Sequence, residues 1–167
     1  MLDIFDLIAQ VETKRNFQAF RFEPDVYARI SASRTDAQKD IIAKIIDAHG
    51  GPANCSWHTA LAIYSTSYGA VQLMGFNLYG PVCGFDESTI SFMLPGEDGI
   101  LPASVELCQR VNFSHLLVSM KLDKATPENL ASSAALRDLF AITYNGSTAY
   151  AAAIVVALQH FAIPVTP

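Results

Sequence analysis

Apolar side chains at the start of the chain recur at the three- and four-residue spacing of a helix with one buried face. They are Leu2, Ile4, Phe5, Leu7, Ile8 and Val11. This pattern predicts a first helix over residues 2–12, with Glu12 at its C-terminal end. The phenylalanines that follow predict an extended, aromatic-rich connection, so we expect a small, shortened β element near residues 13–23.

Three short helices are predicted next. Pro24 can open the first of them, because its fixed φ suits the first helical turn. Thr35 is a preferred N-cap for the second, and Gly50-Gly51 is a strong stop signal after it. Asn54 or Ser56 can cap the third.

The stretch "YSTSYGAVQLMGFNLYG", residues 64–80, follows neither a helical nor an alternating pattern. It sets hydroxyl groups, glycines and a single Gln among large apolar side chains. A core helix would not contain these glycines, and a solvated loop would not carry so many apolar residues. We therefore expect a half-buried turn with polar groups inside it.

Helical patterns return in the second half of the chain. Asp86 can cap a short helix that Pro95-Gly96 ends, and residues 100–122 predict two helical pieces interrupted near Asn112. Pro127 can open a single helix that ends at Gly146.

The last apolar run, "AYAAAIVVAL" at residues 149–158, can be capped by Ser147 or Thr148. It has about half of the ~20 residues that a membrane-spanning helix needs. It therefore predicts a buried helix rather than membrane insertion.

No repeat and no Pro-, Gly- or Ser-rich linker divides the chain, so we predict one mostly α domain over residues 1–167. The composition is 51% hydrophobic and 16% charged, with a mean hydropathy of +0.26, which argues against disorder. A net charge of −5 without a Lys/Arg stripe argues against nucleic acid as a partner.

The cysteines and histidines indicate neither a disulfide framework nor a metal site. Cys55, Cys83 and Cys108 are odd in number and form no CxxC pair, which favours reduced, buried thiols. The four histidines lack zinc-site spacing, and no phosphate-binding glycine motif is present, so we expect neither metal nor cofactor. The N-terminus lacks the basic region of a secretory signal.

Two carboxylates are candidates for acid catalysis. Glu12 would lie at the negative end of a helix among apolar side chains, and both features favour a protonated carboxyl group. A glycosidase acid needs this property to protonate a leaving oxygen near neutral pH. Glu23 lies between Phe22 and Pro24, where it could be buried. Alone, each glutamate also has a structural explanation: a solvated helix end for Glu12, and an ion pair for Glu23.

Polar and aromatic residues elsewhere could hold an uncharged ligand such as a sugar. In the 64–80 stretch, hydroxyl and amide groups could donate hydrogen bonds in a groove and tyrosines could stack on a ring. "TYNGS", residues 143–147, is a good helix C-cap in isolation. The candidate binding residues of the 64–80 stretch are Ser65, Ser67, Tyr68 and Gln72.

Four segments of the chain, taken in order, resemble a known protein family. "VET", "FRFEPDVYARI", "STSYGAVQLMGFN" and "YNG" resemble the N-acetylmuramidase domain of phage endolysins and bacterial cell-wall hydrolases, within the lysozyme-like group. The block at residues 65–77 is long and specific, with Tyr68 where the family usually has Trp. The resemblance covers roughly residues 2–158.

The resemblance implies a lysozyme-like helical fold whose Gly-x-x-Gln turn lines a saccharide cleft. It implies that Glu12 is the catalytic acid, with Glu23 as second choice or structural partner. It also implies that Tyr144 and Asn145 face the acid across the cleft. Peptidoglycan glycan strands are the implied partner, and the β-1,4 bond after N-acetylmuramic acid the implied target.

One departure leaves alternatives open. The family commonly continues with Ser-Gly-Gly and a longer hairpin after the acid, whereas this chain has Thr13-Lys14-Arg15. A lytic transglycosylase, a non-catalytic peptidoglycan-binding module and a purely structural helical protein therefore remain as rival interpretations. Without an export signal, we expect synthesis in the cytoplasm and delivery to the wall by a phage or a secretion machine.

Overall fold

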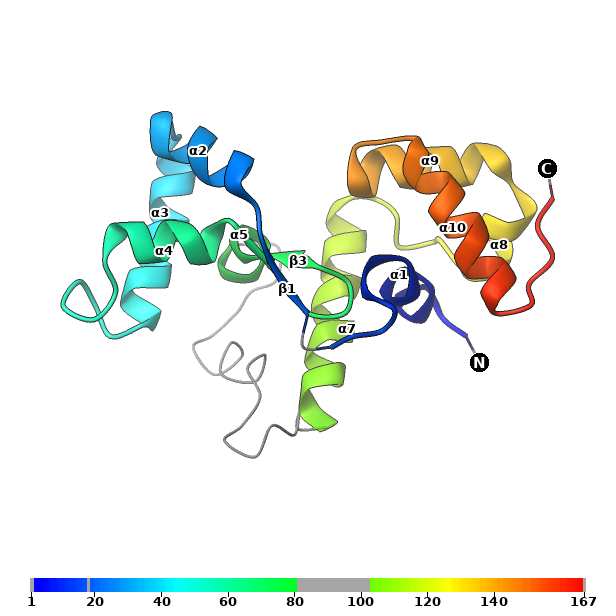
Figure 1. Cartoon of the computed structure of the whole chain (residues 1–167), viewed down its shortest axis with the longest axis horizontal. Helices are drawn as coiled ribbons and strands as arrows, with labels where there is room; N and C mark the ends of the chain where they lie inside the picture. Colours follow the sequence, from blue (N-terminus) through cyan, green and yellow to red (C-terminus); the bar gives the residue numbers. More distant parts are fainter. Residues whose placement is uncertain (1, 18, 81–102, 167) are drawn as a thin grey trace.

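The computed structural model describes residues 2–17, 19–80 and 103–166, and it arranges them in two lobes around a central helix (Figure 1). The predicted fold class, a mostly helical lysozyme-like domain with a small β element, is confirmed. The helix predicted from Asp86 to Pro95 lies outside the described residues.

The first lobe contains short helices packed around a small sheet. Thr35 forms the predicted cap, because its hydroxyl accepts from the backbone N–H of Gln38 while the Gln38 side chain accepts from the backbone N–H of Thr35. Ser56 caps the next helix by accepting from the N–H of Thr59. The helices of this lobe are α2 (Pro24–Ala32), α3 (Asp36–Ala48), α4 (Trp57–Tyr64) and α5 (Gly75–Tyr79).

The second lobe combines the N-terminal helix with the C-terminal helices (Figure 1). Gly146 ends α9 in a left-handed conformation, as predicted, with φ of 81°. The helices of this lobe are α1 (Ile4–Thr13), α8 (Pro127–Ser132), α9 (Ala134–Asn145) and α10 (Ala149–His160), and α7 (Ala103–Ser119) runs between the lobes.

The β element is an antiparallel sheet of three strands, in the order β1-β2-β3. The first strand falls in the predicted region, and the other two come from the 64–80 stretch, where we expected only a turn. Register pairs Phe20 with Tyr68 and Tyr68 with Leu73. The strands are β1 (Phe20–Phe22), β2 (Thr66–Tyr68) and β3 (Leu73–Met74).

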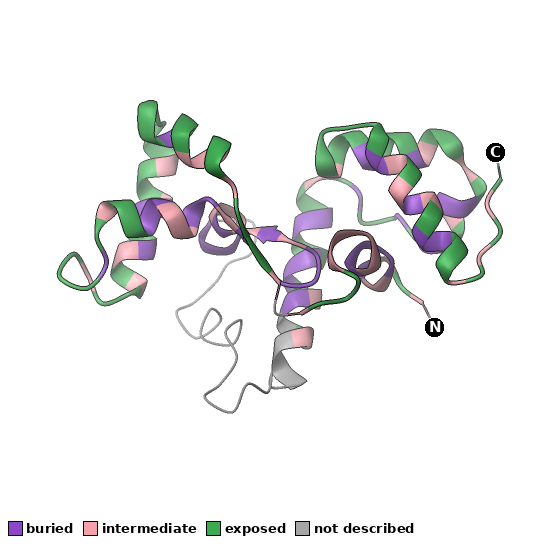
Figure 2. Ribbon diagram, viewed as in Figure 1, coloured by how far each residue is buried: buried purple, intermediate pink, exposed green. Residues whose placement is uncertain are grey.

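Buried side chains cluster where α7 meets α1 and the C-terminal helices (Figure 2). The largest fully buried ones are Phe113 of α7 and Phe140 of α9, at 1% and 0% exposure. Cys55 is a free, buried thiol, while Cys83 and the side chain of Cys108 are not among those described.

Two predictions of helix boundaries were wrong. α7 runs unbroken through Asn112, because an internal Asn costs only a fraction of a kcal/mol and the burial of Phe113 and Leu116 outweighs that cost. The helix predicted from Pro127 to Gly146 instead breaks at Ser133, which is extended and caps α9.

The buried Arg137 explains why the break at Ser133 is stable. Its guanidinium donates to the carbonyl oxygens of Leu130 (2.8 Å) and Ala131 (3.0 Å), and so satisfies acceptors near the end of α8. Among the described residues no single helix is long and apolar enough to cross a membrane. α9 and α10 would pass by length and composition as a pair, but they are bent by 114°.

Candidate functional site

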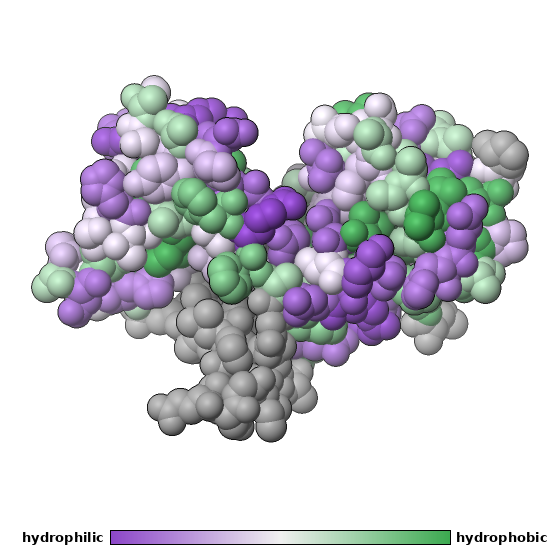
Figure 3. Space-filling view, viewed as in Figure 1, coloured by the Kyte–Doolittle hydropathy of each residue, from purple (hydrophilic) through white to green (hydrophobic). Residues whose placement is uncertain are grey.

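The surface is hollowed between the two lobes, and hydrophilic side chains lie at the base of this hollow (Figure 3). The sheet and the end of α1 come together in the same region of the fold (Figure 1). The chain direction changes sharply there, since Lys14 and Arg15 both take left-handed conformations with φ of 57° and 64°.

Glu12 is half-buried at the end of α1, as the pattern predicted. Its Oε1 accepts a hydrogen bond of 2.6 Å from the hydroxyl of Tyr150, in the first turn of α10. Tyr150 is 8% exposed, and its burial raises its own pKa, so the phenol keeps its proton and acts as the donor. A neutral group therefore orients this carboxyl.

The pKa of Glu12 is raised above its ordinary value, chiefly because burial removes solvent from the carboxylate. The hydrogen bond from Tyr150 and the charge of Arg21 lower this pKa, and the charge of Glu23 raises it. The balance favours the protonated carboxyl. The electrostatic influence of Arg21 and Glu23 also shows that the end of β1 and the end of α1 share one environment.

Glu23 is half-buried just ahead of α2, and its surroundings differ from those of Glu12. The Nε of Arg21 donates to its Oε1 over 2.6 Å, forming an ion pair. Its backbone N–H donates to the carbonyl of Ser65 over 2.8 Å, which ties the start of α2 to the sheet. Glu23 therefore has the ion pair that was its structural explanation, and Arg21 is the partner.

The turn at residues 69–72 lies against α1 and α9, which hold it from two sides. Thr13 donates from its hydroxyl to the carbonyl of Ala70 over 2.9 Å. Tyr144 donates from its phenol to the carbonyl of Val71 over 2.8 Å. Gly69 has φ of 76°, which only glycine adopts without strain. This turn is thus fixed relative to the helix end that carries Glu12.

Gln109 of α7 is the third anchor of this turn, and the sequence did not single it out. It is fully buried, its amide oxygen accepts from the N–H of Ala70 (2.8 Å), and its amide nitrogen donates to the carbonyl of Phe17 (3.0 Å). A Cβ at Gly69 would lie 2.5 Å from this amide. The available sequence signal was an amide side chain within the helical pattern of residues 100–122.

Two of the predicted sugar contacts need correction. Ser65 and Ser67 are 0% and 1% exposed, so burial keeps their hydroxyls away from any ligand in the cleft. Ser67 instead donates to the Oε1 of Gln72 over 2.8 Å and positions that amide. Tyr68 and Gln72 remain partly exposed.

The "YNG" segment divides into a packing residue and an exposed one. The ring of Tyr144 packs against Phe140 and Tyr150, and burial raises its pKa well above the ordinary value. Asn145 is exposed at the end of α9. Tyr150 itself was missed, although it follows this segment by only a few residues at the start of an Ala-rich helix.

No metal site emerges within residues 2–17, 19–80 and 103–166, where no three His, Cys, Asp or Glu side chains gather as ligands. Two histidines bond to tyrosines instead. His58 lies 3.1 Å from the hydroxyl of Tyr27, and His49 lies 2.9 Å from that of Tyr79.

The fold and the site define a lysozyme-like domain with a carboxyl of raised pKa between two lobes. Comparison with known proteins identifies the family to which the chain belongs. The chain is 39% identical over 160 residues to an endolysin of Enterobacteria phage PRD1, a match that covers 96% of this chain and 97% of that protein. The protein therefore belongs to the phage endolysins, which are cell-wall lytic enzymes. No protein-family model and no solved structure matches the chain.

Proposed function

We propose that this endolysin is an N-acetylmuramidase that cleaves the β-1,4 bond between N-acetylmuramic acid and N-acetylglucosamine, with Glu12 as general acid. The observation that carries the proposal is the environment of Glu12: half-buried, raised in pKa and oriented by the phenol of Tyr150. The sequence resemblance supports this reaction, and the PRD1 relative supports the coarser role of a cell-wall lytic enzyme.

The chemistry needs a proton donor at the glycosidic oxygen. A carboxyl whose pKa is raised stays protonated closer to neutral pH, and it can transfer its proton as the bond to the anomeric carbon breaks. The positively charged sugar centre then takes up a water molecule, whose released proton restores Glu12. Tyr150 keeps its own proton throughout and orients the carboxyl.

Glu23 is the second carboxylate that this proposal involves. Its effect on the pKa of Glu12 indicates that the two lie close enough to interact. Held by Arg21, it would stabilise the positive charge that develops on the sugar, or activate the incoming water. Tyr68, Gln72 and Asn145 would hold the glycan, with Ser67 positioning Gln72 from behind and Tyr144 fixing the turn through Val71.

A lytic transglycosylase is the second candidate function, favoured by the engagement of Glu23 with Arg21. If that carboxylate takes no part in the reaction, the 6-hydroxyl of the muramic acid can attack the sugar centre and close a 1,6-anhydro ring. In either case the enzyme would reach the wall from the cytoplasm of an infected cell.

Product analysis distinguishes these reactions. Purified peptidoglycan is digested with wild type, Glu12→Gln and the control Glu128→Gln, which changes an exposed glutamate of α8. Mass spectrometry of the muropeptides should show reducing muramic ends with wild type and the control, and none with Glu12→Gln. Anhydro ends would assign the transglycosylase reaction. A wild type that pellets with the wall but releases nothing would contradict both reactions and leave a binding module.

A further inference from the structure

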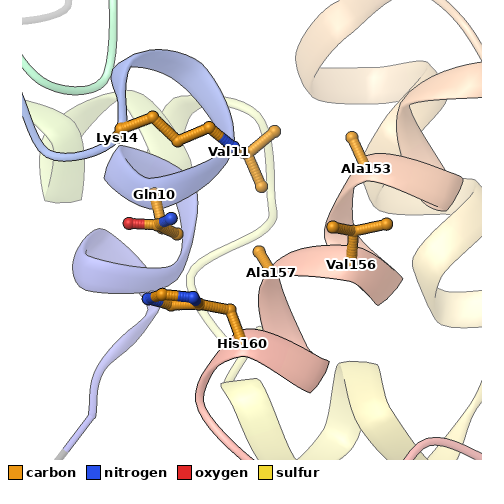
Figure 4. Close-up of a pocket in the computed structure, with 7 residues that line it drawn as sticks. All are labelled: Gln10, Val11, Lys14, Ala153, Val156, Ala157 and His160. Carbon is orange, nitrogen blue, oxygen red and sulfur yellow. The ribbon is translucent and has the colours of Figure 1, made fainter.

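A pocket of about 270 Å³ lies between α1 and α10, on the surface next to the candidate site (Figure 4). α1 contributes Gln10, Val11 and Lys14, while α10 contributes Ala153 and Val156 in its middle and His160 at its end. This pocket is separate from the hollow between the lobes, and none of the predicted site residues lines it.

The pocket begins close to Glu12. Tyr150, which holds the Glu12 carboxyl, lies three residues before Ala153, so the two share one face of α10 about 5 Å apart along its axis. Figure 4 shows Lys14 and Ala153 at one end of the pocket and His160 at the other. The pocket therefore runs away from the carboxyl along α10.

The lining combines an apolar wall with hydrogen-bond donors. Val156 is 60% exposed and offers its apolar side chain to a ligand at the surface. Lys14 supplies a positive charge, and no acidic side chain lines the pocket. Such a surface fits a ligand that carries both small apolar side chains and carboxylates.

We infer that this pocket binds the short peptide attached to the lactyl group of N-acetylmuramic acid, an acidic peptide with small apolar side chains. The inference rests on the proposed function, because this peptide is carried by the same muramic acid whose glycosidic bond Glu12 would cleave, and the pocket begins on the neighbouring turns of α1 and α10. Binding the peptide makes the enzyme select glycan strands that carry it.

Two substrates test the inference: peptidoglycan fragments with their peptides, and glycan strands from which an amidase has removed them. Lys14→Asn removes the charge, and Asn tolerates the left-handed backbone at this position, where φ is 57°. Lys121→Asn is its matched control, since Lys121 is also exposed, with φ of 59°, and does not line the pocket.

Lys14→Asn should lower kcat/KM about tenfold on peptide-bearing fragments, the effect of losing one charge-assisted hydrogen bond. It should leave peptide-free strands unaffected, and Lys121→Asn should change neither. Val156→Glu should show the same selectivity, against the control Leu139→Glu on the exposed face of α9. Equal effects on both substrates, or none, would overturn the inference.

Direct binding separates this inference from the reaction. N-acetylmuramyl dipeptide contains no bond for a muramidase to cut, so calorimetry with Glu12→Gln protein measures binding alone. Binding that weakens with Lys14→Asn but not with Lys121→Asn supports the peptide site, whereas no binding contradicts it. A wild type that cleaves neither glycan substrate contradicts the proposed function, whatever the calorimetry gives.

Discussion

Glu12 and Glu23 are two half-buried glutamates in one electrostatic environment, yet different groups hold them. A neutral phenol donates to Glu12, while a guanidinium donates to Glu23, each over 2.6 Å. The phenol adds no charge that would force Glu12 to ionise, and burial raises its pKa. The ion pair gives Glu23 a positively charged partner, which Glu12 lacks among the described residues.

The difference teaches that the partner of a carboxyl group decides its chemical role more than its depth does. A carboxyl that retains its proton can serve as an acid, and a carboxylate paired with arginine can serve as a charge stabiliser or a base. The predictions below test this division, beginning with the largest expected effect.

Replacing Glu12 and Glu23 one at a time should distinguish the acid from the charge-stabilising carboxylate. Glu12→Gln should lower kcat by about 10²–10⁴, the usual contribution of a general acid. Glu23→Gln should lower it less and also reduce the free energy of unfolding, because Arg21 loses its partner. Kinetics on soluble glycan oligomers and thermal unfolding measure the two effects. A larger kcat loss for Glu23→Gln would exchange the assignments.

Removing the phenol should change the pH profile. Tyr150→Phe deletes the hydrogen bond that favours the charged form of Glu12, so the pKa of Glu12 rises further. A general acid loses activity as pH rises through its pKa, and the alkaline limb of kcat/KM should therefore move to higher pH. Loss of orientation should lower the maximum by up to about tenfold.

Tyr27→Phe is the control for this measurement, because its hydroxyl bonds to His58 and not to a carboxyl. Its alkaline limb should coincide with that of wild type. A Tyr150→Phe profile that also coincides with wild type would show that the phenol does not act on the catalytic proton.

Removing the guanidinium should have a smaller, salt-dependent effect. Arg21 is exposed and lowers the pKa of Glu12 through its charge, so Arg21→Gln should also move the alkaline limb to higher pH. At 1 M salt, interactions between exposed charges are screened beyond about 3 Å. The shift of Arg21→Gln should therefore vanish at 1 M salt, whereas that of Tyr150→Phe should persist. A salt-independent shift in Arg21→Gln would point to a structural rearrangement instead.

The smallest expected effect is on stability. A raised pKa in the folded state means that ionised Glu12 destabilises the fold, a cost absent below pH 4.5 and fully present above the folded pKa. Glu12→Gln should therefore raise Tm at pH 8 and change it little at pH 3.5. An equal change at both pH values would mean that ionisation is not the cause.

Much of the fold was predictable from short segments. The caps at Thr35 and Ser56, the stop at Gly146 and the place of Glu12 at a helix end all follow from residues within one helical turn. The predictions of helix breaks were wrong where burial decided the outcome. The buried side chain of Arg137 bonds to the carbonyl of Leu130 and stabilises a helix end at Ser133 that the apolar pattern did not show.

The sequence by itself determined most helix ends, the turn at Gly69 and the two glutamates, because backbone hydrogen bonds, caps and helical periodicity depend on near neighbours in the chain. Only the tertiary structure decided that Tyr150 holds Glu12, that Gln109 anchors the turn and that Ser67 is buried. These contacts join segments tens of residues apart. Their formation depends on how the helices pack, which no local pattern specifies.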